Sequence, residues 1–406
     1  MATHSLGPGS PACTPTTLAL VTARPKPRVG VYIDYRFRET DHGRSAERAF
    51  ALFLFALEPH VGSLTLIGRL DPSPEPYPYA LPPSVRLIGL PFYATLTRPW
   101  AAAPAIARGA RQAWRALDEV DALWALGPNP MSVLIALLGL VRGRRVVLGV
   151  RQDSARYVRR RHPHRRALWL AADALQGAYR LLARRCPVAV VGDELAAQFA
   201  GGREVLTFVV SLVPEADVAS PRPERAFGRR VLSVGRLDAE KNPGLLLDVA
   251  DLLRDDEGEP WRLEVVGSGP LESQLAQEVA RRGLDEVVRL RGYLALDCGL
   301  VDAYRAADAF LHVSWTEGMP QVLIESFAAG LPTVATAVGG VAAFAGGAAL
   351  LIHPGDAAAA ADALRRLDRD AGLRRRLVEA GAEVARAHTL EAEAARVAAL
   401  LAGGAG

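Results

Sequence analysis

Short runs of β-branched and other apolar residues alternate along the chain with segments of helical spacing. Each run is short enough for one buried strand and ends near a glycine or proline. The first series lies at residues 29–34, 144–150 and 187–192, and the second lies at residues 229–235, 262–267, 287–292, 308–314, 332–336 and 349–355. Strands that alternate with helices indicate βαβ units, in which helices cover both faces of a parallel sheet. The predicted fold class is therefore α/β.

The segments between the strands carry apolar residues at helical spacing. After the first strand and a loop that ends at Gly43, a helix is predicted from Ala46, Ala49, Phe50, Phe53, Leu54 and Leu57. The apolar run at residues 131–141 is about half of the ~20 residues that a membrane-spanning helix needs, so it predicts a core helix and no transmembrane segment. The alanine- and arginine-rich residues 356–401 predict amphipathic surface helices.

Prolines at positions 214, 221 and 223 separate the two series of strands. Because proline disrupts both helices and sheets, residues 214–228 are predicted to be a linker. Two Rossmann-like domains follow, at residues 28–213 and 229–385, with a C-terminal helix and tail at residues 386–406. Residues 1–27 are rich in proline, threonine and alanine and have no charged region before an apolar core, which predicts a disordered leader rather than a signal peptide.

The composition is typical of a soluble protein with a buried core, because 50% of the 406 residues are hydrophobic and 23% are charged. This balance excludes a chain that is disordered throughout. The three cysteines, Cys13, Cys186 and Cys298, are too far apart for a disulfide framework, and no CxxC pair offers metal ligands. A reducing, cytoplasmic location is therefore expected.

Positive charge is unevenly distributed, although the net charge is only +4. Residues 151–190 contain the acids Asp153 and Asp173 against arginines at positions 151, 156, 159, 160, 161, 165, 166, 180, 184 and 185. Three interpretations are open: arginine-rich helices in solvent, a surface at residues 154–185 that contacts an anionic membrane from its inner face, and a nucleic-acid contact. Interleaved aromatic and leucine residues favour the membrane surface over a plain run of charge. No nucleic-acid partner is expected.

Lysine occurs only at positions 26 and 241, and Lys241 lies in the segment SVGRLDAEKNPG at residues 233–244. Arg236 is the first residue after a predicted strand, and Asn242 and Pro243 are expected as the N-cap and first residue of the next helix. Two cations beside free backbone amides suit a nucleotide diphosphate. The alternative is a solvated loop with a surface cluster of arginine, glutamate and lysine.

Two glutamates lie on either side of a predicted helix start in the segment EGMPQVLIE at residues 317–325. Pro320 is expected at the first helical position and Gly330 at the end of the helix. Glu317 then follows a strand end, and Glu325 lies near the second turn. Surface charge is the alternative, but the helix is mostly apolar, and a buried carboxylate needs a partner. Each carboxylate can accept two sugar hydroxyls.

These segments resemble the retaining glycosyltransferases of family four, which have the two-domain GT-B architecture. The resemblance covers residues 229–380 through the motifs VGRLDAEKNP, VVGSGP, RLRGYL and ADAFLHVSWTEGMPQVLIESFAAGLPTVATAVGG, and covers residues 28–213 more loosely. It implies an N-terminal domain on the acceptor side and a C-terminal donor-binding domain, facing each other across a cleft. It implies no cofactor besides the co-substrate, a UDP- or GDP-sugar.

The resemblance also implies how the donor nucleotide is held. Arg236 and Lys241 would bind the diphosphate, and Glu325 would bind the ribose. The backbone around Tyr293 would contact the base. Gly43 would belong to the glycine-containing loop that approaches the phosphates from the N-terminal domain.

At the transferred sugar, the resemblance implies that Glu317 contacts hydroxyl groups as a catalytic residue and that Gly318 and Met319 line the sugar. The chain departs from the family pattern in three places. The N-terminal loop is DHGRSAE instead of a double glycine, and Arg151 replaces a sugar-facing histidine, which makes it a second candidate catalytic residue. Residues 342–343 are two alanines where Pro-Glu is usual.

No metal site is expected. The only DxD pattern, Asp368 and Asp370, lies in a predicted surface helix. The segment GSGPLE at residues 267–272 lacks the third glycine of a dinucleotide fingerprint and is interpreted as a strand-to-helix turn.

The implied activity is transfer of a sugar, with retention, from a nucleotide-diphosphate donor to a hydroxyl of an acceptor glycan or glycolipid, including those of the cell envelope. Two alternatives remain open. One is a GT-B protein that binds a nucleotide sugar with little turnover, and the other is an epimerase or phosphorylase of the same fold. The paired glutamates and the motif RLDAEKNP favour transfer.

Overall fold

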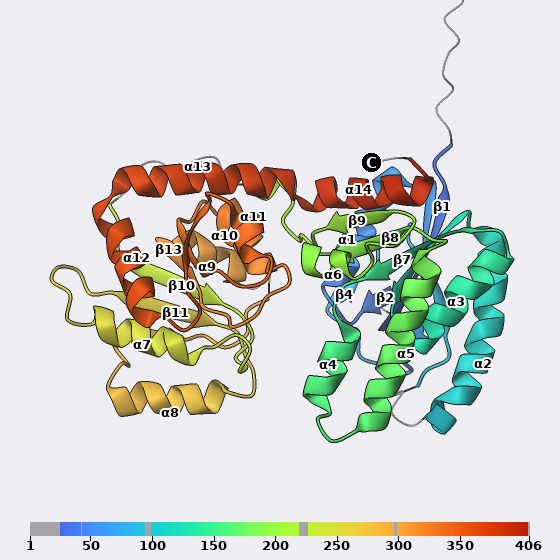
Figure 1. Cartoon of the computed structure of the whole chain (residues 1–406), viewed down its shortest axis with the longest axis horizontal. Coiled ribbons are helices and arrows are strands. Elements are labelled where there is room, and N and C mark those ends of the chain that lie inside the picture. Colours follow the sequence, from blue (N-terminus) through green and yellow to red (C-terminus); the bar gives the residue numbers. More distant parts are fainter. Residues whose placement is uncertain (1–24, 42, 94–98, 219–225, 296–298, 405–406) are drawn as a thin grey trace, which may run out of the picture.

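The computed structural model of the chain describes residues 25–41, 43–93, 99–218, 226–295 and 299–404. These residues form two sheets with their helices, which lie side by side along the long axis of the molecule (Figure 1). Each sheet lies between separate clusters of buried apolar side chains. The predicted α/β class and the two Rossmann-like domains are confirmed.

The N-terminal sheet has nine strands, and its parallel part has the order β5-β3-β1-β6-β7-β8-β9. The chain moves outward from β1 in both directions, as in a Rossmann fold. The strands are β1 (Arg28–Thr40), β2 (Gly43–Ala46), β3 (Ser63–Leu70), β4 (Tyr79–Ala80), β5 (Arg86–Leu90), β6 (Ala122–Gly127), β7 (Arg145–Val150), β8 (Val188–Val191) and β9 (Val205–Phe208). The helices are α1 (Phe50–Phe55), α2 (Pro99–Ala116), α3 (Pro130–Val141), α4 (Ser154–Arg161), α5 (Arg166–Ala183) and α6 (Asp193–Ala197), with 3₁₀ turns η1 (Glu58–His60) and η2 (Leu117–Glu119).

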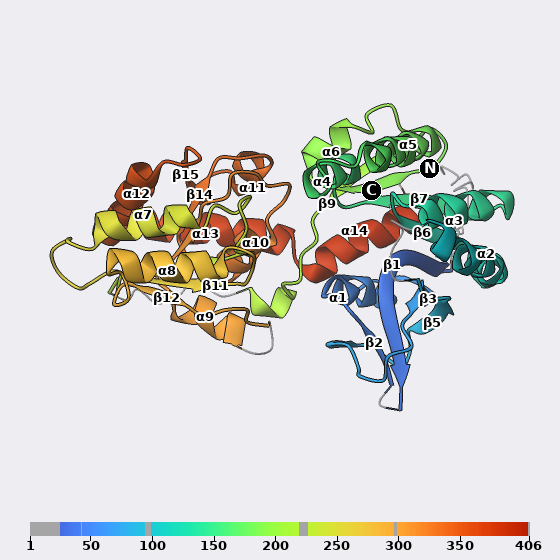
Figure 2. The same cartoon turned by 90° about the horizontal axis from the view of Figure 1, so that it is seen from below.

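Strand β1 continues into an antiparallel hairpin with β2, which pairs in turn with β4. Figure 2 shows the end of β1 projecting beyond the rest of the N-terminal domain, with β2 beside it. The predicted helix at residues 46–57 is therefore wrong at its start, because β2 occupies residues 43–46 and α1 begins only at Phe50. Buried and charged side chains alternate in this part of β1, as expected of a strand. Phe37 is buried, whereas Arg36 and Arg38 on either side pair with Glu47 and Asp71.

The C-terminal sheet is fully parallel, with the order β12-β11-β10-β13-β14-β15. Each of its predicted strands is confirmed. They are β10 (Arg230–Val234), β11 (Arg262–Val266), β12 (Val288–Leu290), β13 (Ala309–His312), β14 (Thr333–Thr336) and β15 (Ala349–Ile352). The helices are α7 (Gly244–Leu253), α8 (Glu272–Arg282), α9 (Val301–Ala306), α10 (Gln321–Ala328), α11 (Val341–Ala345), α12 (Ala357–Arg369) and α13 (Ala371–Ala387). The strand order reverses between β10 and β13, which is where ligands of such sheets bind.

The last helix, α14 (Leu390–Ala402), crosses from the C-terminal domain to the N-terminal one (Figure 1). Its residues Ala394, Val397 and Leu401 are buried in the same cluster as Val29 and Trp124. As predicted for residues 356–401, α14 is amphipathic, with Glu391 and Arg396 exposed, but the sequence does not predict that it packs on the N-terminal domain. Because its apolar side covers one face of the N-terminal sheet, this helix completes the core of a domain far from it in sequence.

Two stretches of the predicted organisation lie partly outside the described residues, namely 1–24 of the leader and 219–225 of the linker. Within the linker, Glu215–Asp217 forms the 3₁₀ turn η3. Val209 and Val213, which precede it, already pack into the core of the C-terminal domain. In the part of the chain that the structure describes, no helix is long and apolar enough to cross a membrane.

Candidate active site

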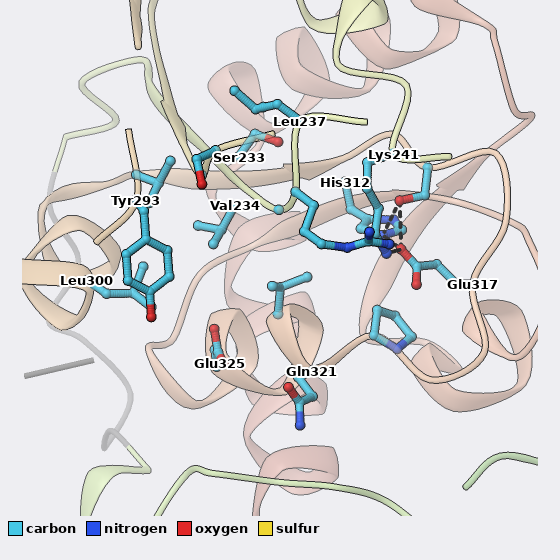
Figure 3. Close-up of a pocket in the computed structure, with 18 of the residues that line it drawn as sticks. Ser233, Val234, Leu237, Lys241, Tyr293, Leu300, His312, Glu317, Gln321 and Glu325 are labelled. Atoms are coloured by element: carbon cyan, nitrogen blue, oxygen red, sulfur yellow. Dashed lines mark hydrogen bonds and ion pairs between the residues drawn. The ribbon is translucent and has the colours of Figure 1, made fainter. Parts of the chain in front are cut away.

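A cavity of about 540 Å³ lies between the two domains. Its C-terminal wall is formed by the loops after β10, β11 and β13 and by the start of α10 (Figure 3). Its N-terminal wall consists of Ala49, Tyr79, Arg151, Val191, Val210 and Leu212. The predicted cleft beyond the ends of the C-terminal strands is therefore confirmed. Its position follows from the topology, since β10 and β13 flank the point where the strand order reverses.

Glu317 is the centre of a buried polar cluster on the C-terminal wall. Its Oε1 atom accepts hydrogen bonds from Lys241 Nζ at 2.6 Å and from Ser314 Oγ at 2.6 Å. The same atom lies 2.9 Å from His312 Nε2 (Figure 3). A carboxylate only accepts, so His312 donates from Nε2. The Oε2 atom of Glu317 accepts no hydrogen bond from the described residues, which leaves it available to a ligand.

The charge of Glu317 is stabilised where it lies. Burial would raise the pKa of this carboxyl, but the hydrogen bond from His312 and the positive charge of Lys241 lower the pKa to about 2. The side chains of Glu317 and Lys241 are only 8% and 25% exposed. An ionised glutamate at this depth needs its partners, so Lys241 has a structural as well as a binding role.

The loop after β10 places Lys241 beside Glu317. Asp238 Oδ1 accepts hydrogen bonds from the backbone amides of Glu240 and Lys241, and the carbonyl of Glu240 accepts one from the amide of Trp315. Asn242 then has φ +52°, in the left-handed region. The expectation that Asn242 caps α7 is therefore wrong by one residue, since the chain turns left-handed there and Pro243 is the N-cap.

Arg236 lines the same cavity but is 68% exposed. Its guanidinium lies 2.5 Å from Asp238 Oδ2 and 3.7 Å from Glu240 Oε2. Exposed ion pairs of this kind contribute little to stability. The guanidinium can therefore turn toward an anion in the cavity at small cost.

Glu325 reaches the cavity from α10 and is half-buried. Tyr304 donates a hydrogen bond from its hydroxyl to Glu325 Oε2 at 2.7 Å. Burial raises the pKa of Glu325, and the bond from Tyr304 offsets only part of this rise. The helix begins one residue later than predicted, because Pro320 is the N-cap instead of the first helical residue. Its predicted end is confirmed by Gly330, which has φ +67°.

Met319 and Tyr293 also line the cavity, and Tyr293 is 67% exposed. Gly318 does not line it. Instead, its carbonyl oxygen packs against Gly340, where a Cβ atom would lie 2.6 Å from it. At Gly339, which has φ +51°, a Cβ atom would lie 1.8 Å from the Glu317 carbonyl. The glycine pair after β14 therefore allows the segment that carries Glu317 to approach this closely.

Residues 222–384 match the family model described as glycosyl transferases group 1. The C-terminal domain belongs to this family. Within the chain, 121 residues are 37% identical to the mannosylfructose-phosphate synthase of Agrobacterium fabrum, covering 28% of the chain and 26% of that protein. Another 156-residue match is 38% identical to a D-inositol 3-phosphate glycosyltransferase of Streptomyces bingchenggensis, covering 36% of the chain and 34% of that protein. The chain therefore matches about a third or less of the length of these curated relatives.

The likeness to solved structures extends over both domains. The structure of Anabaena HepE in complex with UDP superposes with a TM-score of 0.67 at 16% identity, covering 93% of this chain and 100% of that one. At this identity the likeness concerns the fold. The predicted GT-B architecture is confirmed.

The N-terminal wall, opposite the group 1 domain, differs from expectation. Arg151 follows β7 and lines the cavity, as expected of a site residue. Gly43 does not line it, because the β1–β2 hairpin carries this residue away from the cavity, with φ +108° at the start of β2. Ala49, just before α1, occupies the wall instead. The structure therefore does not bring Gly43 to the cavity, and its place in a phosphate-facing loop stays a prediction.

Sequence reasoning missed four residues around the group 1 site, namely His312, Ser314, Tyr304 and Gln321. His312 and Ser314 were detectable, because they are two residues apart at the end of a strand and so point to the same side. Tyr304 and Gln321 gave no signal. Tyr304 donates a hydrogen bond to Glu325. Gln321 donates one to the Val210 carbonyl of the other domain at 2.7 Å.

The DxD pattern has structural partners outside the cavity. Asp368 pairs with Arg229 at 2.7 Å, and Asp370 accepts the Leu373 amide as the N-cap of α13. The turn at residues 267–272 leads from β11 into α8, as predicted. At Gly267, with φ +143°, a Cβ atom would lie 1.8 Å from the Gly235 carbonyl, so glycine is needed there for close approach.

Proposed function

We propose that this protein is a glycosyltransferase that moves a sugar from a UDP- or GDP-sugar to an acceptor hydroxyl, with retention of configuration. The observation that carries the proposal is the convergence of Lys241, Glu317 and Glu325 on one cavity at the switch point of the group 1 domain. Arg236 lines the same cavity. Cations for phosphates and carboxylates for hydroxyls are the groups that a nucleotide sugar requires.

In this proposal the donor lies along the C-terminal wall. Arg236 and Lys241 bind the diphosphate, and Glu325 accepts ribose hydroxyls. The free Oε2 atom of Glu317 accepts hydrogen bonds from hydroxyls of the transferred sugar, which lies beside Met319. The exposed Tyr293 lies beside the nucleotide base. The cluster around Glu317 is formed before any ligand binds, so little ordering is needed on binding.

The reaction exchanges one bond at the anomeric carbon for another. The bond from that carbon to the diphosphate oxygen breaks, and the acceptor oxygen forms its bond on the same face. The acceptor proton passes to the departing phosphate oxygen. Arg236 and Lys241 stabilise the negative charge that develops on the leaving diphosphate, and no metal ion is invoked.

The proposed acceptor is anionic or membrane-linked, such as a phosphorylated polyol or an envelope glycolipid. Two curated relatives, a mannosylfructose-phosphate synthase and a D-inositol 3-phosphate glycosyltransferase, carry a sugar or polyol phosphate in their names. The α4–α5 helix pair also exposes Tyr157, Leu170 and Leu181 by 48%, 71% and 62%. These residues lie in the arginine-rich segment, as in a helix pair that contacts an anionic membrane. Flotation with anionic liposomes at low salt tests this contact, and a protein that stays at the bottom of the gradient would remove it.

The central experiment measures release of free UDP or GDP from a panel of nucleotide sugars in the presence of lipid extract. Release from at least one donor is expected, with the same anomeric configuration in product and donor by NMR. A thermal shift with UDP and GDP is measured in parallel, because ligands of the native state raise its apparent stability. A protein that neither binds nor turns over any donor would contradict the proposal.

A binding protein with little turnover is a second candidate. It is favoured by the hairpin, which carries Gly43 away from the cavity where the resemblance implies a phosphate-facing loop. The two candidates differ in one result: the second predicts a thermal shift with a nucleotide and no release of it from any donor.

A further inference from the structure

Arg151 is a cation of the cavity that has no carboxylate partner among the described residues. It lies at the end of β7 on the N-terminal wall. The two cations of the opposite wall differ in this respect, since Lys241 pairs with Glu317 and Arg236 pairs with Asp238. A partly buried guanidinium that lacks a counter-ion can bind an anionic ligand without first breaking an ion pair.

The carboxylates closest to Arg151 in sequence and in the cavity are already engaged. Asp153 accepts the amide of Arg156 with Oδ1 and the side chain of Gln198 with Oδ2. Glu317 accepts three donors on one oxygen, and Glu325 is bound by Tyr304. None of these groups neutralises Arg151 in the described structure.

The guanidinium of Arg151 is nonetheless held in place. Its Nη2 atom donates to the Tyr35 hydroxyl at 2.7 Å, and its Cζ atom lies 4.0 Å from the ring centroid of Phe50 and 5.3 Å from that of Tyr35. The Nη1 and Nε groups make no hydrogen bond to a described residue. A planar guanidinium fixed by stacking, with donors to spare, suits a carboxylate or a phosphate.

We propose that Arg151 binds an anionic group of the substrate, which makes this residue the determinant of preference for a charged substrate on the N-terminal wall. The inference rests on the proposed glycosyltransferase function. Two sources supply such a group: the carboxylate of a uronic-acid donor and the phosphate of an acceptor. The chemistry at Arg151 is the same for both, and the experiment separates them.

The donor experiment compares Kd values for UDP-glucuronic acid and UDP-glucose, or for the mannuronic acid and mannose donors if GDP is the nucleotide that binds. The acceptor experiment titrates inorganic phosphate into protein saturated with that nucleoside diphosphate. One of two results is expected, each of about tenfold or more, as for a charge-assisted hydrogen bond. Either the wild type binds the charged donor more tightly than the neutral one, or the wild type binds phosphate more tightly than Arg151→Gln does. Preference in the first assigns a uronic-acid donor, and preference in the second assigns a phosphorylated acceptor.

Three variants isolate the role of Arg151. Arg151→Gln should lose the preference, whereas Arg151→Lys should keep part of it, because the charge remains while the planar fork is lost. Arg48→Gln is the matched control, since Arg48 stacks on the same Tyr35 ring but does not line the cavity. A wild type without preference in either experiment overturns the inference. An unchanged preference for the charged donor in Arg151→Gln, or an unchanged affinity of this variant for phosphate, also overturns it, because Arg151 would then only support Tyr35 and Phe50.

The affinity for UDP or GDP alone separates this inference from the proposed function. If the nucleotide binds and the anion preference is absent, only the role of Arg151 fails. If no nucleotide binds to the wild type, the proposed function itself fails.

Discussion

The two walls of the cavity are built in different ways. On the C-terminal wall, Lys241, His312 and Ser314 converge on one oxygen of Glu317, so the side chains hold one another in place. On the N-terminal wall, apolar residues surround a single charged side chain, Arg151, which is fixed by aromatic rings. The first wall is organised by mutual hydrogen bonds, and the second by packing.

This difference separates two tasks. In the proposed function, a hydrogen-bonded cluster that exists before the ligand arrives binds the donor, through Lys241 at the diphosphate and Glu317 at the transferred sugar. A wall of packed side chains with one unpaired cation is suited to discriminate among substrates. Substitutions on the two walls should therefore differ in kind: those on the C-terminal wall should abolish turnover, and those on the N-terminal wall should change preference.

The largest effect is expected from Glu317→Gln. The amide oxygen can still occupy the Oε1 position, but the negative charge that pairs with Lys241 is lost, and an NH₂ donor replaces the acceptor Oε2 that faces the ligand. Release of nucleoside diphosphate should fall by about 10³-fold, and the free energy of unfolding should fall by about 3 kcal/mol, as for a broken buried pair. Enzyme assays and urea denaturation at pH 7 check both. A variant as active as the wild type would show that the cluster is not part of the site.

Lys241→Ala should have the next largest effect, with turnover lower by about 10²-fold. Its stability should also fall, because Glu317 would remain buried without its cation. Lys241→Arg is the matched variant, since it keeps the charge. It should recover most of the stability, which urea denaturation measures, while turnover recovers only in part because the guanidinium has a different shape. Equal turnover in the alanine variant and the wild type would remove Lys241 from the proposed diphosphate site.

Arg236→Gln should weaken binding of UDP or GDP by about tenfold without a measurable change in unfolding free energy, because Arg236 is exposed. The control is Arg281→Gln, in which an arginine of the same exposure also has a carboxylate partner but lies outside the cavity. Calorimetric titration measures both. Equal affinities of the two variants would place the diphosphate elsewhere.

Glu325→Gln should reveal the cost of a buried carboxylate. Burial raises the pKa of Glu325 above its usual value of 4.5, so the folded protein holds this proton at a pH where the unfolded chain has released it. The contribution of Glu325 to the stability of the wild type therefore falls as pH rises above 4.5, and the variant lacks this contribution. The melting temperature of the variant relative to the wild type should increase from pH 4.5 upward, while nucleotide affinity falls. A constant difference would contradict the raised pKa, and Glu383→Gln on the exposed side of α13 is the control.

The smallest effect is expected at the contact between the domains. Gln321→Ala removes the hydrogen bond to the Val210 carbonyl, and about 1 kcal/mol of unfolding free energy should be lost. Gln277→Ala on the exposed side of α8 is the control. If denaturation finds the same loss in both variants, the hydrogen bond between Gln321 and Val210 does not stabilise the folded protein.

The sequence predicted the two walls unequally. Strands of the C-terminal sheet are buried on both faces, so their continuous apolar runs were visible, and the residues at their ends could be placed by topology alone. In the N-terminal domain, strands such as β3 and β6 were missed. Most of the hairpin of β1 and β2 was interpreted as a loop that ends at Gly43, and its last residue as the start of a helix, because Ala46, Ala49 and Phe50 also fit helical spacing.

Pairings between distant residues were beyond a reading of local pattern. The contact of Tyr304 with Glu325 and the burial of α14 in the N-terminal core depend on how the domains fold together. Glu317 and Lys241 were found because their motifs are distinctive. The fact that each stabilises the other required the structure.

The most direct test of the account is a crystal structure of the protein with UDP or GDP, whichever binds. The account predicts that the diphosphate contacts Arg236 and Lys241 and that a ribose hydroxyl donates to Glu325, all in the cavity between the domains. A nucleotide bound elsewhere on the molecule, or one that contacts none of these three side chains, would contradict it.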